Sequence, residues 1–242
     1  MAKKLGVLGG LGPMASVYFY ELLTRHTEAS CDQDHLDLIL SSSATTPDRT
    51  AFILGQSTED PLPYMLADAE HLVAAGADVI AIPCNTAHYF YDALAAALPV
   101  PIINIIYETV RSLAAIGVKK FGLLATAGTA AAGGYAQVGE QFGLECVLPS
   151  PTEQDVLSEL IYSSIKQGKS PDLTAFSALS ARLLDAGCDR LVLGCTELSL
   201  LRRDAGLTSP YFDSLDALAY RSILTCGKTP VGFDRDFAEA AQ

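Results

Sequence analysis

The chain has 242 residues, half of them hydrophobic, and 16 Lys and Arg against 28 Asp and Glu give it a formal net charge of −12. This balance disfavours nucleic acids and anionic membranes as partners, because both require clustered Lys and Arg. The sequence has no apolar run near the roughly 18 residues that span a bilayer, and the apolar stretch at its start fits a strand better than a signal segment. We therefore expect a cytoplasmic protein that contacts no membrane.

Strand and helix patterns alternate in the first hundred residues, as in folds with parallel sheets. A helix beginning at Pro13 is expected because its first turn does not need the missing N–H, and Gly76 is a typical helix end. The elements expected here are a strand over 4–10, the helix from Pro13, a strand over 36–43, a helix over 61–76 and a strand over 78–83.

The same alternation begins again after Pro101. The elements expected there are helices over 104–116, 130–142, 152–168 and 171–186, and strands over 119–126, 144–148 and 190–194. A last strand and helix, over about 209–226, are expected to return to the first half.

These patterns predict an α/β fold of two similar Rossmann-like, or flavodoxin-like, domains with parallel sheets, related by pseudo-twofold symmetry and enclosing the active site between them. The first domain is expected to be discontinuous, covering 1–103 plus about 208–226. The second covers 104–207, and 227–242 is expected to be a loose tail.

An internal duplication supports the two domains. Aligned without a gap, AGADVIAIPCNTAH (75–88) and AGCDRLVLGCTELS (186–199) place Cys84 opposite Cys195. Both cysteines follow a strand, and open parallel sheets bind ligands beyond the carboxyl ends of their strands. One thiol from each half would provide two proton carriers, one on each side of a single carbon.

The remaining cysteines are interpreted as packing residues, since a free buried cysteine behaves as a small hydrophobe. Cys84 and Cys195 differ because polar residues and a helix start follow each, and a helix N-terminus is expected to lower the pKa of a thiol. The sequence contains no CxxC and no Cys/His cluster at zinc spacing, so we expect neither a metal site nor a disulfide framework.

Two cations stand out in this anionic chain. Arg49 in TTPDRT follows the second strand, where a guanidinium can grip a carboxylate, and a surface ion pair with Asp48 is the alternative. Lys166 in IYSSIKQG is by pattern alone equally well interpreted as a solvated lysine at a helix end.

Polar residues capable of both helix capping and ligand binding surround the two cysteines. They are Asn85, Thr86, Thr126, Thr129, Thr196 and Glu197. His88 lies one helical turn after Cys84 and is interpreted as a structural group rather than a catalytic base.

The turn GLGPMA (10–15) formally satisfies the dinucleotide fingerprint. That reading requires an acidic residue at the end of the second strand, which here ends in serines, and Pro13 removes a phosphate donor. We instead assign Gly12 and Pro13 to a turn that faces a small anionic ligand.

Together GGLGP, PDRT, PCNTAH, IKQG and GCTEL, in this order, resemble the aspartate/glutamate racemase family over residues 5–215. The resemblance implies an isomerase that needs no cofactor and interconverts L- and D-aspartate, with glutamate or broader specificity left open. It implies Cys84 and Cys195 as thiolate base and thiol acid, and a homodimer.

The resemblance also implies roles for the binding residues. Arg49 and Lys166 would hold the distal carboxylate of an acidic amino acid, and Glu197 would pair with the substrate ammonium or orient Cys195. The residues implied to bind the α-carboxylate and ammonium region are Asn85, Thr86, Thr126, Thr129 and Thr196.

Three alternatives remain at this stage. The first is a related reaction, such as maleate isomerisation, hydantoin racemisation or arylmalonate decarboxylation; the pair of cations argues against hydantoin and aryl substrates. The second is a non-catalytic protein that binds an acidic amino acid, against which the two thiols argue. The third is a dithiol redox protein, and we predict that the two sulfurs stand too far apart to form a disulfide.

Overall fold

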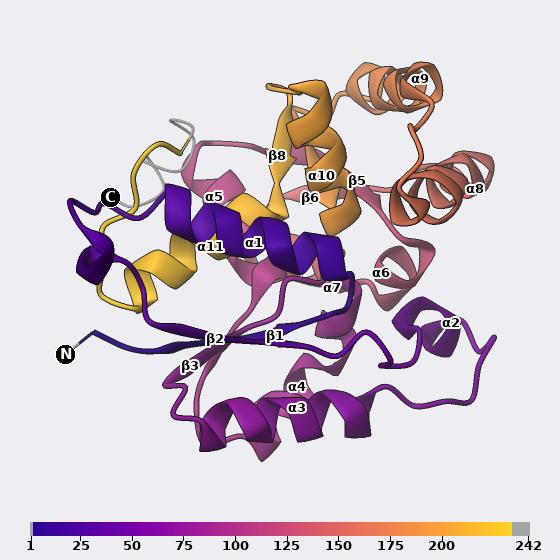
Figure 1. The fold of residues 1–242 in the computed structure, drawn as a ribbon. Coiled ribbons are helices and arrows are strands. Elements are labelled where there is room, and N and C mark those ends of the chain that lie inside the picture. The colour runs from indigo at the N-terminus through magenta and orange to yellow at the C-terminus, as the bar shows by residue number, and fades with distance from the viewer. Residues whose placement is uncertain (1, 234–242) are drawn as a thin grey trace.

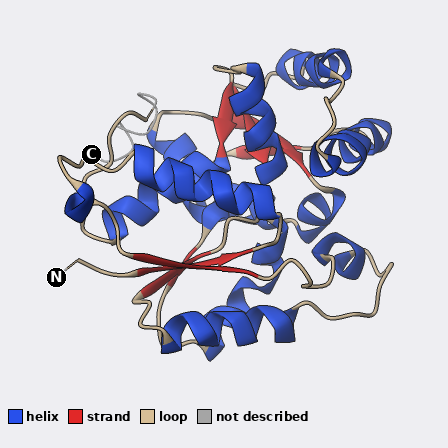
Figure 2. Cartoon of the chain, in the orientation of Figure 1, coloured by secondary structure: helices blue, strands red, loops and turns tan. Residues whose placement is uncertain are grey.

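The computed structural model describes residues 2–233, whose strands form two four-stranded parallel sheets surrounded by helices (Figures 1 and 2). The first sheet has the order β2-β1-β3-β4 and the second β6-β5-β7-β8. Because the two orders are equivalent, the predicted pair of similar α/β units is confirmed. In this part of the chain no helix is long and apolar enough to cross a membrane.

The elements of the first sheet and its helices are β1 (Leu5–Gly9), α1 (Pro13–Arg25), η1 (Asp32–Asp34), β2 (Leu38–Ser42), α2 (Arg49–Ile53), α3 (Leu62–Ala74), β3 (Val79–Ala81), η2 (Thr86–Phe90), α4 (Tyr91–Ala97) and β4 (Ile102–Ile103). The elements that follow are α5 (Ile105–Ala115), β5 (Lys120–Ala125), α6 (Ala127–Ala132), α7 (Gly134–Phe142), β6 (Glu145–Val147), α8 (Pro151–Glu159), η3 (Leu160–Ser164), η4 (Ile165–Gln167), α9 (Leu173–Asp185), β7 (Arg190–Gly194), α10 (Thr196–Ala205), β8 (Tyr211–Asp213) and α11 (Ser214–Thr225).

The strand expected to return to the first half does not do so. β8 instead pairs in parallel with β7, with Leu191 opposite Tyr211 and Leu193 opposite Asp213. A β7-α10-β8 crossover places β8 beside the strand that precedes it, the usual arrangement of consecutive elements. Of the expected strand and helix, it is the helix α11 that reaches back, where it packs against α5 and α1 (Figure 1).

Two expected helices are interrupted. The helix predicted over 130–142 is divided into α6 and α7 at Gly133, whose φ of +71° is left-handed. The helix predicted over 152–168 is α-helical only to Glu159, then passes through the π-helical turn η3 and the 3₁₀ turn η4. The second interruption lies beside the cavity described below.

The two sheets share one hydrophobic core. Parallel strands are buried on both faces, so alternate residues of one strand pack into different layers. Val7 of β1 and Val192 of β7 belong to the same central cluster, together with residues of α1, α5 and α11. Leu8 faces α3 in an outer cluster, and Leu193 packs with α9 in another. The central layer fixes the carboxyl ends of both sheets relative to each other.

The segment expected to be a loose tail is attached where the structure describes it. Pro230 forms an antiparallel bridge with Thr27, and the Val231 N–H donates to the carbonyl of His26 at 2.8 Å. The ring of Phe233 packs against that of His26. Residues 234–242 lie outside the described part.

Candidate active site

A small cavity lies where the carboxyl ends of the two sheets meet. It is lined from the first half by Leu11, Asp48, Arg49, Thr50, Cys84, Asn85 and Thr86, and from the second by Thr126, Tyr162, Lys166, Cys195, Thr196 and Glu197. These residues follow β1, β2 and β3 on one side and β5 and β7 on the other, with Tyr162 and Lys166 from η3 and η4. The cleft predicted from the strand ends therefore brings both cysteines to one cavity.

Many of the lining residues occupy helix starts. Asp48 is the N-cap of α2, Asn85 that of η2, Thr126 that of α6, and Cys195 that of α10. The first N–H groups of a helix have no partner within it and carry partial positive charge. The cavity wall is therefore suited to carboxylate groups.

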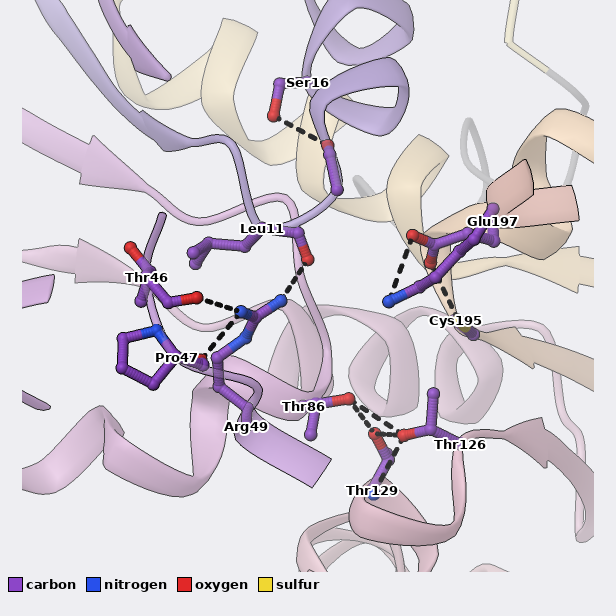
Figure 3. A network of polar contacts seen from close by, with 12 residues as sticks. Leu11, Ser16, Thr46, Pro47, Arg49, Thr86, Thr126, Thr129, Cys195 and Glu197 are labelled. Carbon is purple, nitrogen blue, oxygen red and sulfur yellow. Dashed lines mark hydrogen bonds and ion pairs between the residues drawn. The ribbon is translucent and has the colours of Figure 1, made fainter. Parts of the chain in front are cut away.

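Cys195, Glu197 and Lys166 form a connected chain. The Cys195 thiol donates to Oε2 of Glu197 at 3.0 Å, and Lys166 Nζ lies 3.8 Å from Oε1 (Figure 3). Burial and the negative charge of Glu197 raise the pKa of the Cys195 thiol well above its usual range. The expectation of a lowered pKa is therefore wrong for Cys195, because desolvation and the carboxylate outweigh the helix N-terminus.

Gly12 makes room for that carboxylate. A Cβ atom at position 12 would lie 2.4 Å from Oε1 of Glu197, which is shorter than the distances that Cβ atoms in proteins keep from other atoms. Gly12 is half-buried beside the cavity, whereas Pro13 is exposed on the first turn of α1 and does not line it. Gly12 thus contacts the site through Glu197.

Arg49 is buried and connects two loops of the first half. Its Nη1 donates to the carbonyls of Thr46 and Pro47, and its Nη2 donates to the carbonyl of Leu11 at 2.6 Å (Figure 3). Its Nε is buried without a hydrogen-bond partner. Since a guanidinium carries five N–H donors, two remain beside those three bonds.

Three threonine hydroxyls meet across the halves. Thr86 Oγ1 lies 2.9 Å from both Thr126 Oγ1 and Thr129 Oγ1, which are 3.0 Å apart (Figure 3). The Thr129 N–H also donates to Thr126 Oγ1 at 3.2 Å, an N-cap bond. Thr86 and Thr126 line the cavity, whereas Thr129 does not. Capping and joining the halves are therefore their roles in this structure.

His88 holds the backbone at Cys84. Its Nε2 accepts from the Ile105 N–H at 3.1 Å, so the ring proton lies on Nδ1, which donates to the Cys84 carbonyl at 2.9 Å. Burial lowers the pKa of His88 to about 4. His88 is therefore neutral near pH 7, as a structural group would be.

Comparison with known proteins identifies the family. A family model described as Asp/Glu/Hydantoin racemase matches residues 8–221. The chain belongs to this family. Its assignment makes the protein a racemase, an enzyme of the isomerase class.

The broad specificity amino-acid racemase RacX of Bacillus subtilis is 29% identical to this racemase over 230 residues, covering 91% of this chain and 97% of that protein. A glutamate racemase of Shewanella loihica is 30% identical over 163 residues, covering 64% and 59%. Among solved structures, the Picrophilus torridus aspartate racemase has a TM-score of 0.81 at 27% identity, covering 99% and 100% of the two chains. An aspartate racemase homologue from Pyrococcus horikoshii has a TM-score of 0.74 at 26% identity, covering 93% and 99%.

Sequence reasoning missed part of the cavity of this racemase. Leu11, Asp48, Thr50 and Tyr162 line it but were not predicted. Asp48 caps α2 by accepting from the Ala51 N–H at 2.7 Å. The signal for Tyr162 was its spacing of four residues from Lys166, which places two side chains on one helix face.

The two cavity cysteines are free thiols. Among the described residues, no group of three His, Cys, Asp or Glu side chains is arranged to hold a metal ion.

Proposed function

We propose that this racemase interconverts L- and D-aspartate without a cofactor, with Cys84 and Cys195 as the two acid/base groups. The observation that carries the proposal is the presence of one thiol from each half in a single cavity that also contains Arg49 and Lys166. Racemisation removes the Cα proton from one face and delivers a proton to the other, so it uses one such group on each side.

In one direction the Cys84 thiolate accepts the Cα proton and the Cys195 thiol donates a proton to the opposite face. The reaction leaves Cys84 as thiol and Cys195 as thiolate, which are the starting states for the other enantiomer. The hydrogen bond from the Cys195 thiol to Glu197 supports the protonated form of Cys195. Glu197 orients that thiol, and a substrate ammonium near Glu197 would offset its charge.

The negative charge that develops on the substrate requires nearby donors. The helix starts at Thr126 and Thr196 support binding of the α-carboxylate there. The two N–H donors left on Arg49 are the number that a bidentate carboxylate contact uses. Together with Lys166 they support a substrate with a second carboxylate, and we propose aspartate before glutamate.

We further propose that the enzyme is a cytoplasmic homodimer. Met14, Val17 and Tyr20 lie three residues apart on one face of α1 and are 56%, 57% and 52% exposed. Six free cysteines fit a reducing compartment. Light scattering during gel filtration tests the dimer, and Val17→Asp is expected to yield monomers. A wild-type protein that elutes as a monomer at micromolar concentration would refute the proposed homodimer.

The catalytic proposal is tested by circular dichroism with L-aspartate in the presence of a chelator and without pyridoxal phosphate. We expect the signal to decay to zero with the wild type, and Cys84→Ser and Cys195→Ser each to abolish the decay. Cys188→Ser, which changes a buried cysteine outside the cavity, is the control expected to keep activity. Full activity of either cavity variant would refute the two-thiol assignment.

A further inference from the structure

Tyr162 lines the cavity but has no role in the proposed racemisation. It lies in the π-helical turn η3, and Lys166 follows in the 3₁₀ turn η4, which is capped by Gly168 with a left-handed φ of +68°. Single π-helical turns are uncommon and occur frequently at functional sites. Both side chains line the cavity.

Tyr162 and Lys166 contact each other directly. The Lys166 Nζ lies 4.6 Å from the centroid of the Tyr162 ring, within the range of a cation–π interaction. The ammonium also lies 3.8 Å from Oε1 of Glu197, near the outer limit of an ion pair. The side chain of Lys166 is only 26% exposed, so the contact with the ring is largely shielded from water. The ammonium thus contacts both an aromatic ring and a carboxylate.

We propose that Tyr162 is a positioning residue that determines specificity for a dicarboxylic substrate. Its ring holds the Lys166 ammonium in the cavity while the side-chain carboxylate of the substrate replaces Glu197 as the partner of the ammonium. The inference rests on the proposed function, because it assumes an acidic amino acid as substrate. A neutral ring suits this role, since Lys166 keeps its contact with the ring when its anionic partner changes.

A further observation supports a neutral ring. Burial raises the pKa of Tyr162 to about 12, so the phenol carries no charge over the working pH range of most enzymes. Thr50 of α2, in the first half, lines the same cavity.

The substitutions that test this separate the ring from the hydroxyl. Tyr162→Phe keeps the ring, whereas Tyr162→Leu and Tyr162→Met fill part of its volume without one. Two non-aromatic variants are used so that the test stands if one of them fails to fold. Thermal unfolding shows whether each variant is folded. Tyr211→Leu is the matched control: Tyr211 stacks on Phe176 in the second half, outside the cavity.

The measurements are kcat and KM for aspartate and for alanine, and the Kd of succinate, a dicarboxylate that binds without reaction. We expect the non-aromatic variants to raise KM for aspartate and Kd for succinate about tenfold, the effect of losing a partly buried cation–π contact. For these non-aromatic variants we expect kcat for aspartate to stay within about threefold of the wild type and kcat/KM for alanine to be unchanged. We expect Tyr162→Phe and Tyr211→Leu to have constants near those of the wild type.

Equal losses for aspartate and alanine, or unchanged succinate binding in the non-aromatic variants, would overturn the inference. A Tyr162→Phe variant as impaired as Tyr162→Leu would also overturn it, because the hydroxyl would then carry the effect. If the wild type bound succinate in a ring-dependent manner but did not racemise aspartate, the carboxylate site would stand and the proposed function would fail. If the wild type neither bound succinate in this manner nor racemised aspartate, the inference and the proposed function would both fail.

Discussion

Gly12→Ala tests whether Glu197 is held in a fixed position. The new Cβ would lie 2.4 Å from Oε1 of Glu197, whereas Cβ atoms in proteins essentially never lie within 3.0 Å of another atom. The carboxylate must therefore move away by about 0.6 Å. The φ of Gly12 is −143°, which alanine adopts without strain. The substitution therefore displaces the carboxylate rather than the backbone.

The displacement weakens the bond between the Cys195 thiol and Glu197. Hydrogen bonds to charged groups contribute about 1.5–3 kcal/mol, which corresponds to a rate loss of about 10- to 100-fold. We expect Gly12→Ala to lower kcat/KM for aspartate by that factor while the melting temperature changes by only a few degrees. Circular dichroism gives the rate, and differential scanning calorimetry gives the melting temperature.

Two variants make this prediction specific. Gly134→Ala introduces the same methyl group at a helix start outside the cavity, where the nearest atom is Ile106 Cδ1 at 3.1 Å, and is expected to keep activity. In a Glu197→Ala background the atom that the new Cβ meets is absent, so adding Gly12→Ala is expected to cost less than about twofold. Full activity of Gly12→Ala alone, or an additive loss in the double variant, would refute the reasoning.

The remaining predictions concern pH. Activity requires one thiolate and one thiol, so the alkaline limb of the kcat/KM profile reports loss of the last thiol. Because Glu197 raises the pKa of Cys195, Glu197→Gln is expected to move that limb to lower pH; a limb that stayed in place or moved higher would contradict this. The pKa of His88 is about 4, below its usual 6.5, so as the pH falls this side chain is protonated in the unfolded chain before it is protonated in the folded one. The free energy of unfolding therefore decreases as the pH drops from 6.5 to 4. Between pH 6.5 and 4, the free energy of unfolding measured with denaturant is expected to fall by about 3 kcal/mol less for His88→Asn than for the wild type. The exposed His71→Asn is the control, and parallel curves for His88→Asn and the wild type would contradict the assignment.

The sequence predicted the fold well where periodicity and duplication agreed. Strand ends placed Cys84 and Cys195 correctly, because parallel strands deliver their following residues to the same edge. The placement of β8 was wrong, since a three-residue strand fits the edge of either sheet by pattern alone. The left-handed break at Gly133 and the π-helical turn around Tyr162 are local departures from regular helix geometry, which hydrophobic periodicity does not encode.

The chemistry of the site was less accessible from sequence. Motif position indicated Arg49, Lys166 and Glu197, but not that Arg49 donates to three carbonyls or that Glu197 accepts from Cys195. The pKa of Cys195 depends on burial and on the conformation of Glu197, both of which are tertiary properties. For the same reason the sequence suggested a glycine-rich turn but not that Gly12 leaves space for a carboxylate.

The two-thiol mechanism is tested most directly by incubating unlabelled L-aspartate with the enzyme in deuterium oxide and stopping at low conversion. Mass spectrometry after chiral separation then gives the deuterium at Cα of each enantiomer. We predict that the D-aspartate formed carries deuterium at Cα and that the remaining L-aspartate carries none, because the departing and arriving protons use different thiols. Product that retained the original hydrogen, or equal labelling of both enantiomers, would contradict the mechanism.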